Sequence, residues 1–132
     1  HVIPGITAGI GGLAAAGIPV PHRDVNQSVT FLTGHDQQGL TPSAVNWSSV
    51  AGSGMIVMYM AVKNIAEISA ALIGAGRAAD DPVCVVKNAT LQNMEVLETT
   101  LATAAADIAK TGIGSPAIIS IGRGNLLREQ LG

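Results

Sequence analysis

Short apolar runs alternate along the chain with segments whose apolar residues recur at helical spacing. Strands are predicted where β-branched, aromatic or aliphatic residues follow one another and a turn residue ends the run. The run 55–60 is apolar at nearly every position, which is typical of a strand covered on both faces. The predicted strands cover residues 28–33, 55–60, 83–86, 92–99 and 117–121, of which 92–99 is the most polar.

Three segments have the pattern of helices. Residues 65–75 give the clearest amphipathic helix, because Ile65, Ile68 and Leu72 fall on one face and Glu67 falls on the opposite one. The other two predicted helices are a small-residue helix over 7–16, capped by Thr7 and ended by Gly17, and a helix from Leu101 to Ile108 with Gly112 closing it.

Strands that alternate with helices indicate an α/β fold. With 132 residues there is room for one domain, so residues 1–132 are expected to form a single mixed sheet flanked by helices on both faces. No internal repeat is visible in the sequence.

Composition narrows the possible functions. Hydrophobic residues make up 48% of the chain and charged residues only 12%, about half the roughly 25% usual for soluble domains. This apolar excess excludes disorder, and the net charge of −2 excludes a basic nucleic-acid surface. A mean hydropathy of +0.42 leaves little polar surface, so we expect a partner to cover part of the domain.

The first 22 residues carry no formally charged side chain, which raises the question of a membrane span or a signal peptide. Prolines and glycines interrupt this segment, so neither is expected. Cys84 is the only cysteine, which suits a reducing compartment such as the cytoplasm. Because the chain begins with His1 and not Met, we expect it to be a processed or truncated piece.

Two kinds of motif have a functional and a structural interpretation. Residues 9–14 match a dinucleotide fingerprint with Ala14 last, but they lie inside a predicted helix, which favours close packing of glycines. The polar clusters 22–24 and 35–36 could suggest a hydrolase triad or a metal site. Neither has the required spacing, so we predict no catalytic residue and no metal ligand, and structural or anion-contacting roles instead.

Met60 and the triplet 88–90 follow two of the buried strands. Ligands of open α/β sheets bind at the carboxyl ends of strands, and small residues there leave room for a flat ring. From the pattern alone, a core role for Met60 is favoured over contact with a ligand.

Segments along nearly the whole chain resemble the second half of the tetrapyrrole (uroporphyrinogen-III/precorrin) methylases, specifically of uroporphyrinogen-III C-methyltransferases. The resemblance rests on motifs that occur in the same order, so it is more specific than any single motif. These motifs are Val2-Ile3-Pro4-Gly5-Ile6-Thr7-Ala8, Ala16-Gly17-Ile18-Pro19-Val20, His22-Arg23-Asp24, Val29-Thr30-Phe31-Leu32-Thr33-Gly34-His35, Met58-Tyr59-Met60, Asn88-Ala89-Thr90, Ser115-Pro116-Ala117-Ile118-Ile119 and Gly122-Arg123.

The resemblance implies a methyltransferase that uses S-adenosyl-L-methionine, releases S-adenosyl-L-homocysteine and converts uroporphyrinogen III to precorrin-2 for sirohaem, cobalamin and haem d1. It implies a cytoplasmic homodimer with the cofactor between two α/β domains. His22 and Arg23 would contact the carboxylates of the substrate. The implied cofactor-binding residues are Thr7, Ala8, Met60, Ala89, Pro116 and Ala117.

The sequence also departs from the pattern of that family. The glycine-rich loops and the acid–base residues of the family's first domain have no counterpart here. Pro21 stands where Thr is usual, and Ala61 stands where Gly usually follows Met60, so its methyl group is expected to crowd the cofactor. We therefore expect a C-terminal domain over 1–132 that lacks its N-terminal domain and is inactive alone. The alternative is a non-catalytic module for small-molecule binding or assembly.

Overall fold

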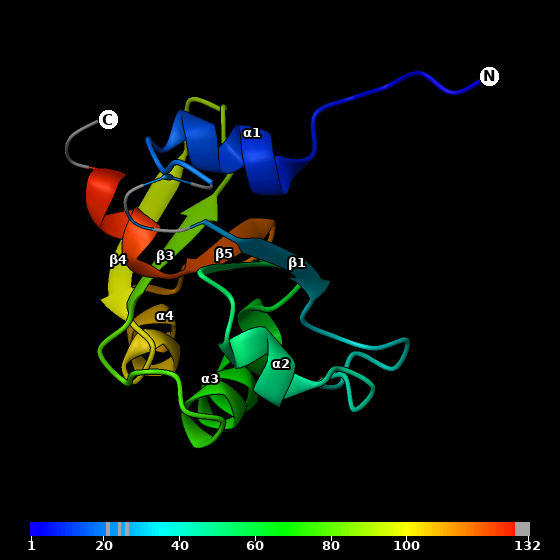
Figure 1. Cartoon of the computed structure of the whole chain (residues 1–132). Coiled ribbons are helices and arrows are strands. Elements are labelled where there is room, and N and C mark those ends of the chain that lie inside the picture. Colours follow the sequence, from blue (N-terminus) through cyan, green and yellow to red (C-terminus); the bar gives the residue numbers. More distant parts are fainter. Residues whose placement is uncertain (21, 24, 26, 129–132) are drawn as a thin grey trace.

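The structure, a computed structural model, describes all residues except 21, 24, 26 and 129–132. Within the described residues, five strands form one sheet in the order β1-β2-β5-β3-β4 (Figure 1). The strands are β1 (Val29–Thr33), β2 (Met55–Tyr59), β3 (Pro82–Lys87), β4 (Glu95–Thr100) and β5 (Ala117–Ile121).

The sheet is mixed, as predicted. Strand β1 pairs in parallel with β2, whereas β5 lies antiparallel between β2 and β3, and β4 pairs antiparallel with β3. Strands β1, β2 and β3 therefore run in the same direction. Their carboxyl ends meet at one edge of the sheet, where β4 and β5 begin.

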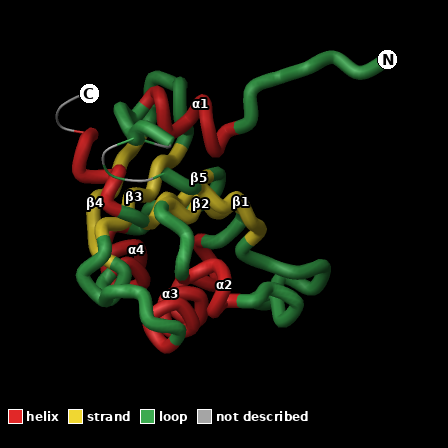
Figure 2. The backbone as a smooth tube through the Cα atoms, in the orientation of Figure 1, coloured by secondary structure: helices red, strands yellow, loops and turns green. Residues whose placement is uncertain are grey.

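Helices cover both faces of the sheet, also as predicted. Helix α1 (Ala8–Ala15) lies on one face, and α2 (Trp47–Ala51), α3 (Ile65–Gly74) and α4 (Ala104–Thr111) lie on the other (Figure 2). Alternate residues of β2 serve the two cores: Met55 and Val57 pack beneath α1, while Ile56 and Met58 pack toward the other helices. All four side chains are fully buried, which explains the unbroken apolar run.

Some element boundaries differ from those predicted. Strand β4 begins at Glu95 because the preceding residues form turns, in which the amide of Leu91 donates to the Asn88 carbonyl (3.1 Å). Helix α4 begins at Ala104, because residues 101–103 form a turn before it, in which Leu101 donates its amide to the Asp81 carbonyl (2.9 Å).

Three short elements were not predicted, since none carries an apolar period. Asn46 caps the start of helix α2, because its side chain accepts a hydrogen bond from the Ser49 amide (3.2 Å). The turns η1 (Val62–Asn64) and η2 (Arg123–Leu127) follow the ends of β2 and β5. In η2, the Asn125 side-chain amide donates to the Pro82 and Ser120 carbonyls (3.0 and 2.9 Å).

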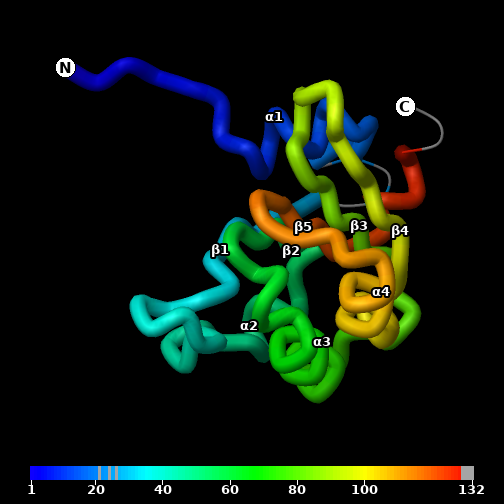
Figure 3. Tube along the Cα trace, turned by 180° about the vertical axis from the view of Figure 1, so that it is seen from behind, coloured from blue at the N-terminus to red at the C-terminus, as the bar shows by residue number. Residues whose placement is uncertain are grey.

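The segment before α1 extends away from the sheet (Figure 3). Its apolar side chains are almost fully exposed: Val2 at 94%, Ile3 at 89% and Ile6 at 84%. Among the described residues, no helix is long and apolar enough to span a membrane. The domain therefore has an extended segment before α1 whose apolar side chains are exposed.

Candidate functional site

A cavity of about 470 Å³ opens at the sheet edge where β1, β2 and β3 end. We call it the strand-end cavity. Its lining comes from the start of α1, the residues after β2 and β3, and the residues that lead into β5. These segments are far apart in the sequence, and the strand order together with the packing of α1 on the sheet brings them together. The lining residues are Ala8, Tyr59, Met60, Val86, Asn88, Ala89, Leu91, Ser115, Pro116, Ala117 and Ile118.

A second cavity of about 430 Å³, the adjoining cavity, lies beside the first along α1. Ala8 and Ala89 line both cavities, so they mark the boundary between them. Thr7, Gly11 and Gly12 contribute the α1 side of the adjoining cavity. Of the residues predicted to bind the cofactor, the strand-end cavity gathers Ala8, Met60, Ala89, Pro116 and Ala117, and the adjoining cavity adds Thr7.

The backbone at this edge has an unusual conformation. Met60, Asn88 and Thr90 have positive φ angles of 55°, 51° and 70°, which non-glycine residues seldom adopt. Each such residue costs on the order of 1–3 kcal/mol, and such strain tends to cluster at functional sites. All three follow β2 or β3 at the cavities, which supports a ligand-binding role for this edge.

Met60 does not belong to the core. Its side chain is 52% exposed although it directly follows the buried strand β2. The left-handed conformation turns the chain at this point, so the thioether lies at the cavity wall. The core interpretation of Met60 is therefore wrong.

Close packing explains the glycines of α1, in agreement with the structural interpretation of residues 9–14. A Cβ atom built on Gly9 would lie 2.5 Å from the Tyr59 hydroxyl, and one built on Gly12 would lie 3.0 Å from the Ala89 methyl group. Thr7 is the N-cap residue of α1, but its side chain makes no capping hydrogen bond. Its hydroxyl instead bonds the Tyr59 hydroxyl.

Tyr59 is a cavity residue that sequence reasoning missed. Its hydroxyl bonds Thr7 and accepts a hydrogen bond from the Gly9 amide (3.0 Å), so it joins the end of β2 to the start of α1. Its status as the single tyrosine of the chain was a visible signal. Its partners depend on tertiary packing, which the sequence pattern does not reveal.

The predicted substrate residues lie elsewhere. Neither His22 nor Arg23 is among the residues that line the two cavities. Arg23 is exposed, and its carbonyl oxygen accepts a hydrogen bond from the Gln27 side chain (3.3 Å). Asp24 of the same motif and Pro21 lie outside the described residues.

The cluster at 35–36 shapes a loop. The Asp36 carboxylate accepts hydrogen bonds from the Gln38 and Leu40 amides (2.8 and 2.9 Å), which hold the pKa of that carboxyl below its usual value. The side-chain amide of Asn64 fastens the loop by donating to the Gly34 and Gly39 carbonyls (2.9 and 3.1 Å). No group of three metal-ligating side chains occurs in the part of the chain that the structure describes.

Ala61 has a different position from the one expected. It is fully buried in the core beneath α3, where it packs against Gly34, and it does not line either cavity. The expectation that its methyl group crowds the cofactor is therefore wrong, because the left-handed turn at Met60 directs the next residue into the core.

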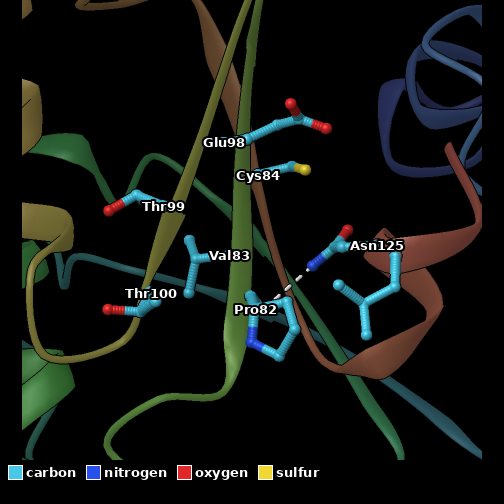
Figure 4. Close-up of a pocket in the computed structure, with 8 residues that line it drawn as sticks. Pro82, Val83, Cys84, Glu98, Thr99, Thr100 and Asn125 are labelled. Atoms are coloured by element: carbon cyan, nitrogen blue, oxygen red, sulfur yellow. Dashed lines mark hydrogen bonds between the residues drawn. The ribbon is translucent and has the colours of Figure 1, made fainter. Parts of the chain in front are cut away.

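Another cavity, of about 370 Å³, lies between β3, β4 and η2 (Figure 4). Its polar groups do not converge, since the Thr99 and Thr100 hydroxyls point away from Asn125. Those hydroxyls bond Thr103, and the Asn125 side chain bonds Ser120 and Pro82. Burial raises the pKa of the Cys84 thiol to about 12, so the thiol stays protonated and is a poor nucleophile.

The fold and the cavities define an α/β domain with two cavities at the carboxyl ends of its strands, the place where open α/β sheets bind ligands. A family model described as Tetrapyrrole (Corrin/Porphyrin) Methylases matches residues 1–105, and the chain belongs to this family. The resemblance inferred from the sequence is confirmed at the level of the family.

Individual relatives agree with this assignment. The chain is 57% identical over 132 residues to a uroporphyrinogen-III C-methyltransferase from Sinorhizobium sp and 43% identical over 123 residues to one from Synechocystis sp.. These alignments cover 99% and 92% of the chain but 47% of each relative, so the chain spans about half their length.

The fold matches that of a solved relative. The crystal structure of uroporphyrin-III C-methyl transferase from Thermus thermophilus, complexed with S-adenyl homocysteine, superposes with a TM-score of 0.80 at 24% identity. The match covers 96% of this chain and 53% of that one. At this identity, the likeness shows the fold, including the mixed sheet with helices on both faces.

Proposed function

We propose that this chain is the C-terminal, cofactor-binding domain of an S-adenosyl-L-methionine-dependent uroporphyrinogen-III C-methyltransferase that makes precorrin-2. The observation that carries the proposal is the convergence of Ala8, Met60, Ala89, Pro116 and Ala117 on the strand-end cavity, with Thr7 beside it. The names of the two bacterial relatives support the reaction.

The cavities fit a cofactor of this size and chemistry. Volumes of about 470 and 430 Å³ lie in the range of small-molecule sites. Three alanines in the wall, Ala8, Ala89 and Ala117, leave space for a flat purine ring, and the exposed Met60 thioether can pack against such a ring. The S-adenyl homocysteine bound by the Thermus protein supports the same ligand here.

The cofactor supplies an electrophilic methyl group, so the protein mainly has to position two reactants. In this chain, the α1 start, Met60 and the residues that lead into β5 would line the cofactor and hold it in place. The chain supplies no catalytic acid or base in this proposal. The exposed guanidinium of Arg23, with His22, would contact carboxylates of the substrate as it enters.

We also propose that a first domain completes the cleft and that the chain alone does not transfer methyl groups. The relatives are about twice as long, which leaves room for such a domain. Exposed Met60 and Leu91 line the strand-end cavity, and exposed Ile6 lines the adjoining one. Ile3 and Ile10 are also exposed, so an apolar partner would cover this side. A cytoplasmic homodimer agrees with the single cysteine and low charge.

Calorimetric titration of S-adenosylhomocysteine into the purified chain tests the proposal, with and without the separately expressed first domain of a close relative. Heat with the chain alone would support a cofactor site on this domain. Heat only after the first domain is added would support a shared site. No heat in either case, with association of the domains demonstrated, would favour the non-catalytic module.

Matched variants test the location of the site. Ala89→Gln places a bulky polar group between the two cavities and is expected to weaken binding at least tenfold. Ala106→Gln makes the same change on the exposed side of α4, across the sheet, and is expected to bind normally. A folded Ala89→Gln protein with unchanged affinity would refute the assigned site, and methyl transfer by the pure chain would refute its inactivity.

A further inference from the structure

The Tyr59 hydroxyl joins the two walls of the strand-end cavity. It is the last residue of β2, and its hydroxyl bonds the Thr7 hydroxyl and accepts from the Gly9 amide (3.0 Å). Thr7 and Gly9 flank the cavity residue Ala8, and Tyr59 directly precedes the cavity residue Met60. One side chain therefore fixes the distance between two wall residues that are far apart in the sequence.

The local structure around these bonds is built for this contact. Gly9 has no side chain, and a Cβ there would lie 2.5 Å from the Tyr59 hydroxyl, so glycine alone lets the hydroxyl reach the amide without a shift. Thr7 occupies the N-cap position but does not cap the helix with its own side chain. The Tyr59 hydroxyl thus takes over part of the capping of α1 from outside the helix.

The start of α1 has little other support on its N-terminal side. The preceding segment is extended and exposed, with Ile6 84% accessible. Tyr59 itself is well fixed, because its carbonyl accepts from the Gly34 amide (2.7 Å) and its side chain packs against the apolar cluster beneath α1 that contains Leu13 and Val57. The well-fixed Tyr59 therefore supports the N-terminal end of α1, which has few other contacts to hold it.

We propose that Tyr59 is a positioning residue for the cofactor: its hydroxyl sets the first turn of α1 against the end of β2 and so preorganises the cavity. This inference rests on the proposed function for the identity of the ligand. The geometry of the three residues, which we call the Tyr59 clamp, does not depend on it.

Binding of S-adenosylhomocysteine to Tyr59→Phe tests the first part of this inference. The ring stays and only the hydroxyl is lost, so we expect affinity to fall about threefold to tenfold, the effect of one or two neutral hydrogen bonds. Thr7→Val should give a similar fall. Because both changes remove the same bond, the double variant should bind hardly more weakly than Tyr59→Phe alone. Thr111→Val removes a hydroxyl from the end of α4 and should bind like the unmodified chain.

Amide hydrogen exchange separates positioning from general stabilisation. In Tyr59→Phe, the Gly9 amide should exchange at least tenfold faster while the amides of β2 and β5 keep their protection. Unchanged affinity, or falls in affinity that multiply in the double variant, would overturn the proposal. Faster exchange throughout the sheet would also overturn it, since the tyrosine would then act as a core residue.

The exchange measurement keeps this inference distinct from the proposed function. If the chain binds no S-adenosylhomocysteine under any condition, the proposed function fails. Faster exchange confined to Gly9 and its neighbours in α1 would still support the clamp, and normal exchange there would refute it.

Discussion

Gly12 of α1 lies so close to Ala89 that a Cβ atom added to it would stand 3.0 Å from the Ala89 methyl group. This contact seats the helix on the residues that follow β3 and separates the two cavities, both of which Ala89 lines. The glycine therefore sets how near α1 approaches the sheet edge, and so sets the width of the site.

Gly12→Val should displace α1 because the added side chain has no space. We expect unfolding to become easier by about 1–3 kcal/mol, the usual effect of overpacking, and affinity for S-adenosylhomocysteine to fall. Gly74→Val is the matched control, since Gly74 ends α3 and nothing lies within 4 Å of its added Cβ. Urea unfolding of both variants measures the difference, and equal losses of stability would contradict this account of α1.

Arg77 stabilises the junction between α2, α3 and β3. Its Nε donates to the Asp81 carboxylate (2.6 Å), and its Nη atoms donate to the Ala51, Ser53 and Gly54 carbonyls. The side chains of Arg77 and Asp81 are each only 10% exposed, so removal of the guanidinium would leave a buried carboxylate unpaired. Arg77→Met should reduce the free energy of unfolding by about 3–5 kcal/mol.

Arg123→Met serves as the control for Arg77, because both arginines line a surface cavity of about 290 Å³ but Arg123 is exposed. It should change stability by less than about 0.5 kcal/mol. Arg77→Lys should fall between the two, since lysine keeps the charge but loses the planar fork. A loss in Arg77→Met no greater than that in Arg123→Met, measured by urea unfolding, would show that the buried network contributes little.

Asn64 holds the loop that follows β1. Asn64→Ala removes the hydrogen bonds to the Gly34 and Gly39 carbonyls. The Gly34 carbonyl, whose bond to Asn64 is buried, then loses this donor. We expect a loss of about 1–3 kcal/mol and faster amide exchange at Leu40. Asn93→Ala, in the exposed turn before β4, should leave both quantities unchanged, and equal effects of the two substitutions would contradict the role of Asn64.

Much of the fold follows from local patterns. The unbroken apolar runs 55–60 and 83–86 predicted buried strands, and the structure explains these runs because helices cover both faces of the sheet. The apolar stripe along residues 65–75 predicted α3. The strand order and the insertion of β5 between β2 and β3 could not be predicted, because they depend on pairing between distant segments. The start of helix α2 is marked by the hydrogen bond that the Asn46 side chain accepts from the Ser49 amide, and the pattern of apolar residues gives no sign of this bond.

The candidate site was predictable to a similar extent. The position of Met60 and Ala89 after buried strands pointed to the sheet edge where the strand-end cavity lies, and the resemblance added the α1 and β5 residues that line it. Tyr59 was missed because its role depends on a contact with Gly9, fifty residues earlier in the chain. Ala61 was misplaced because sequence does not reveal the left-handed turn at Met60.

Cys84 makes stability depend on pH at the alkaline end. Its side chain is buried, and burial raises the pKa of the thiol from its usual value near 9 to about 12. Between these values, the unfolded chain releases the proton while the folded chain keeps it, so stability falls as the pH rises. The contribution is fully present below about pH 9, and by pH 10 about 1 kcal/mol should be lost.

Cys84→Val isolates this contribution because it preserves the apolar volume and removes the titrating group. Urea unfolding at pH 8 and pH 10 should show a drop in the free energy of unfolding that is about 1 kcal/mol larger for the unmodified chain than for the variant. In the folded chain at pH 8, a thiol reagent such as dithionitrobenzoate should react with Cys84 only at the rate of unfolding. Rapid modification of the folded chain would show that the thiol is accessible, and equal drops in the two proteins would show that it ionises normally. Either result would contradict the burial of Cys84 in the cluster beneath α1.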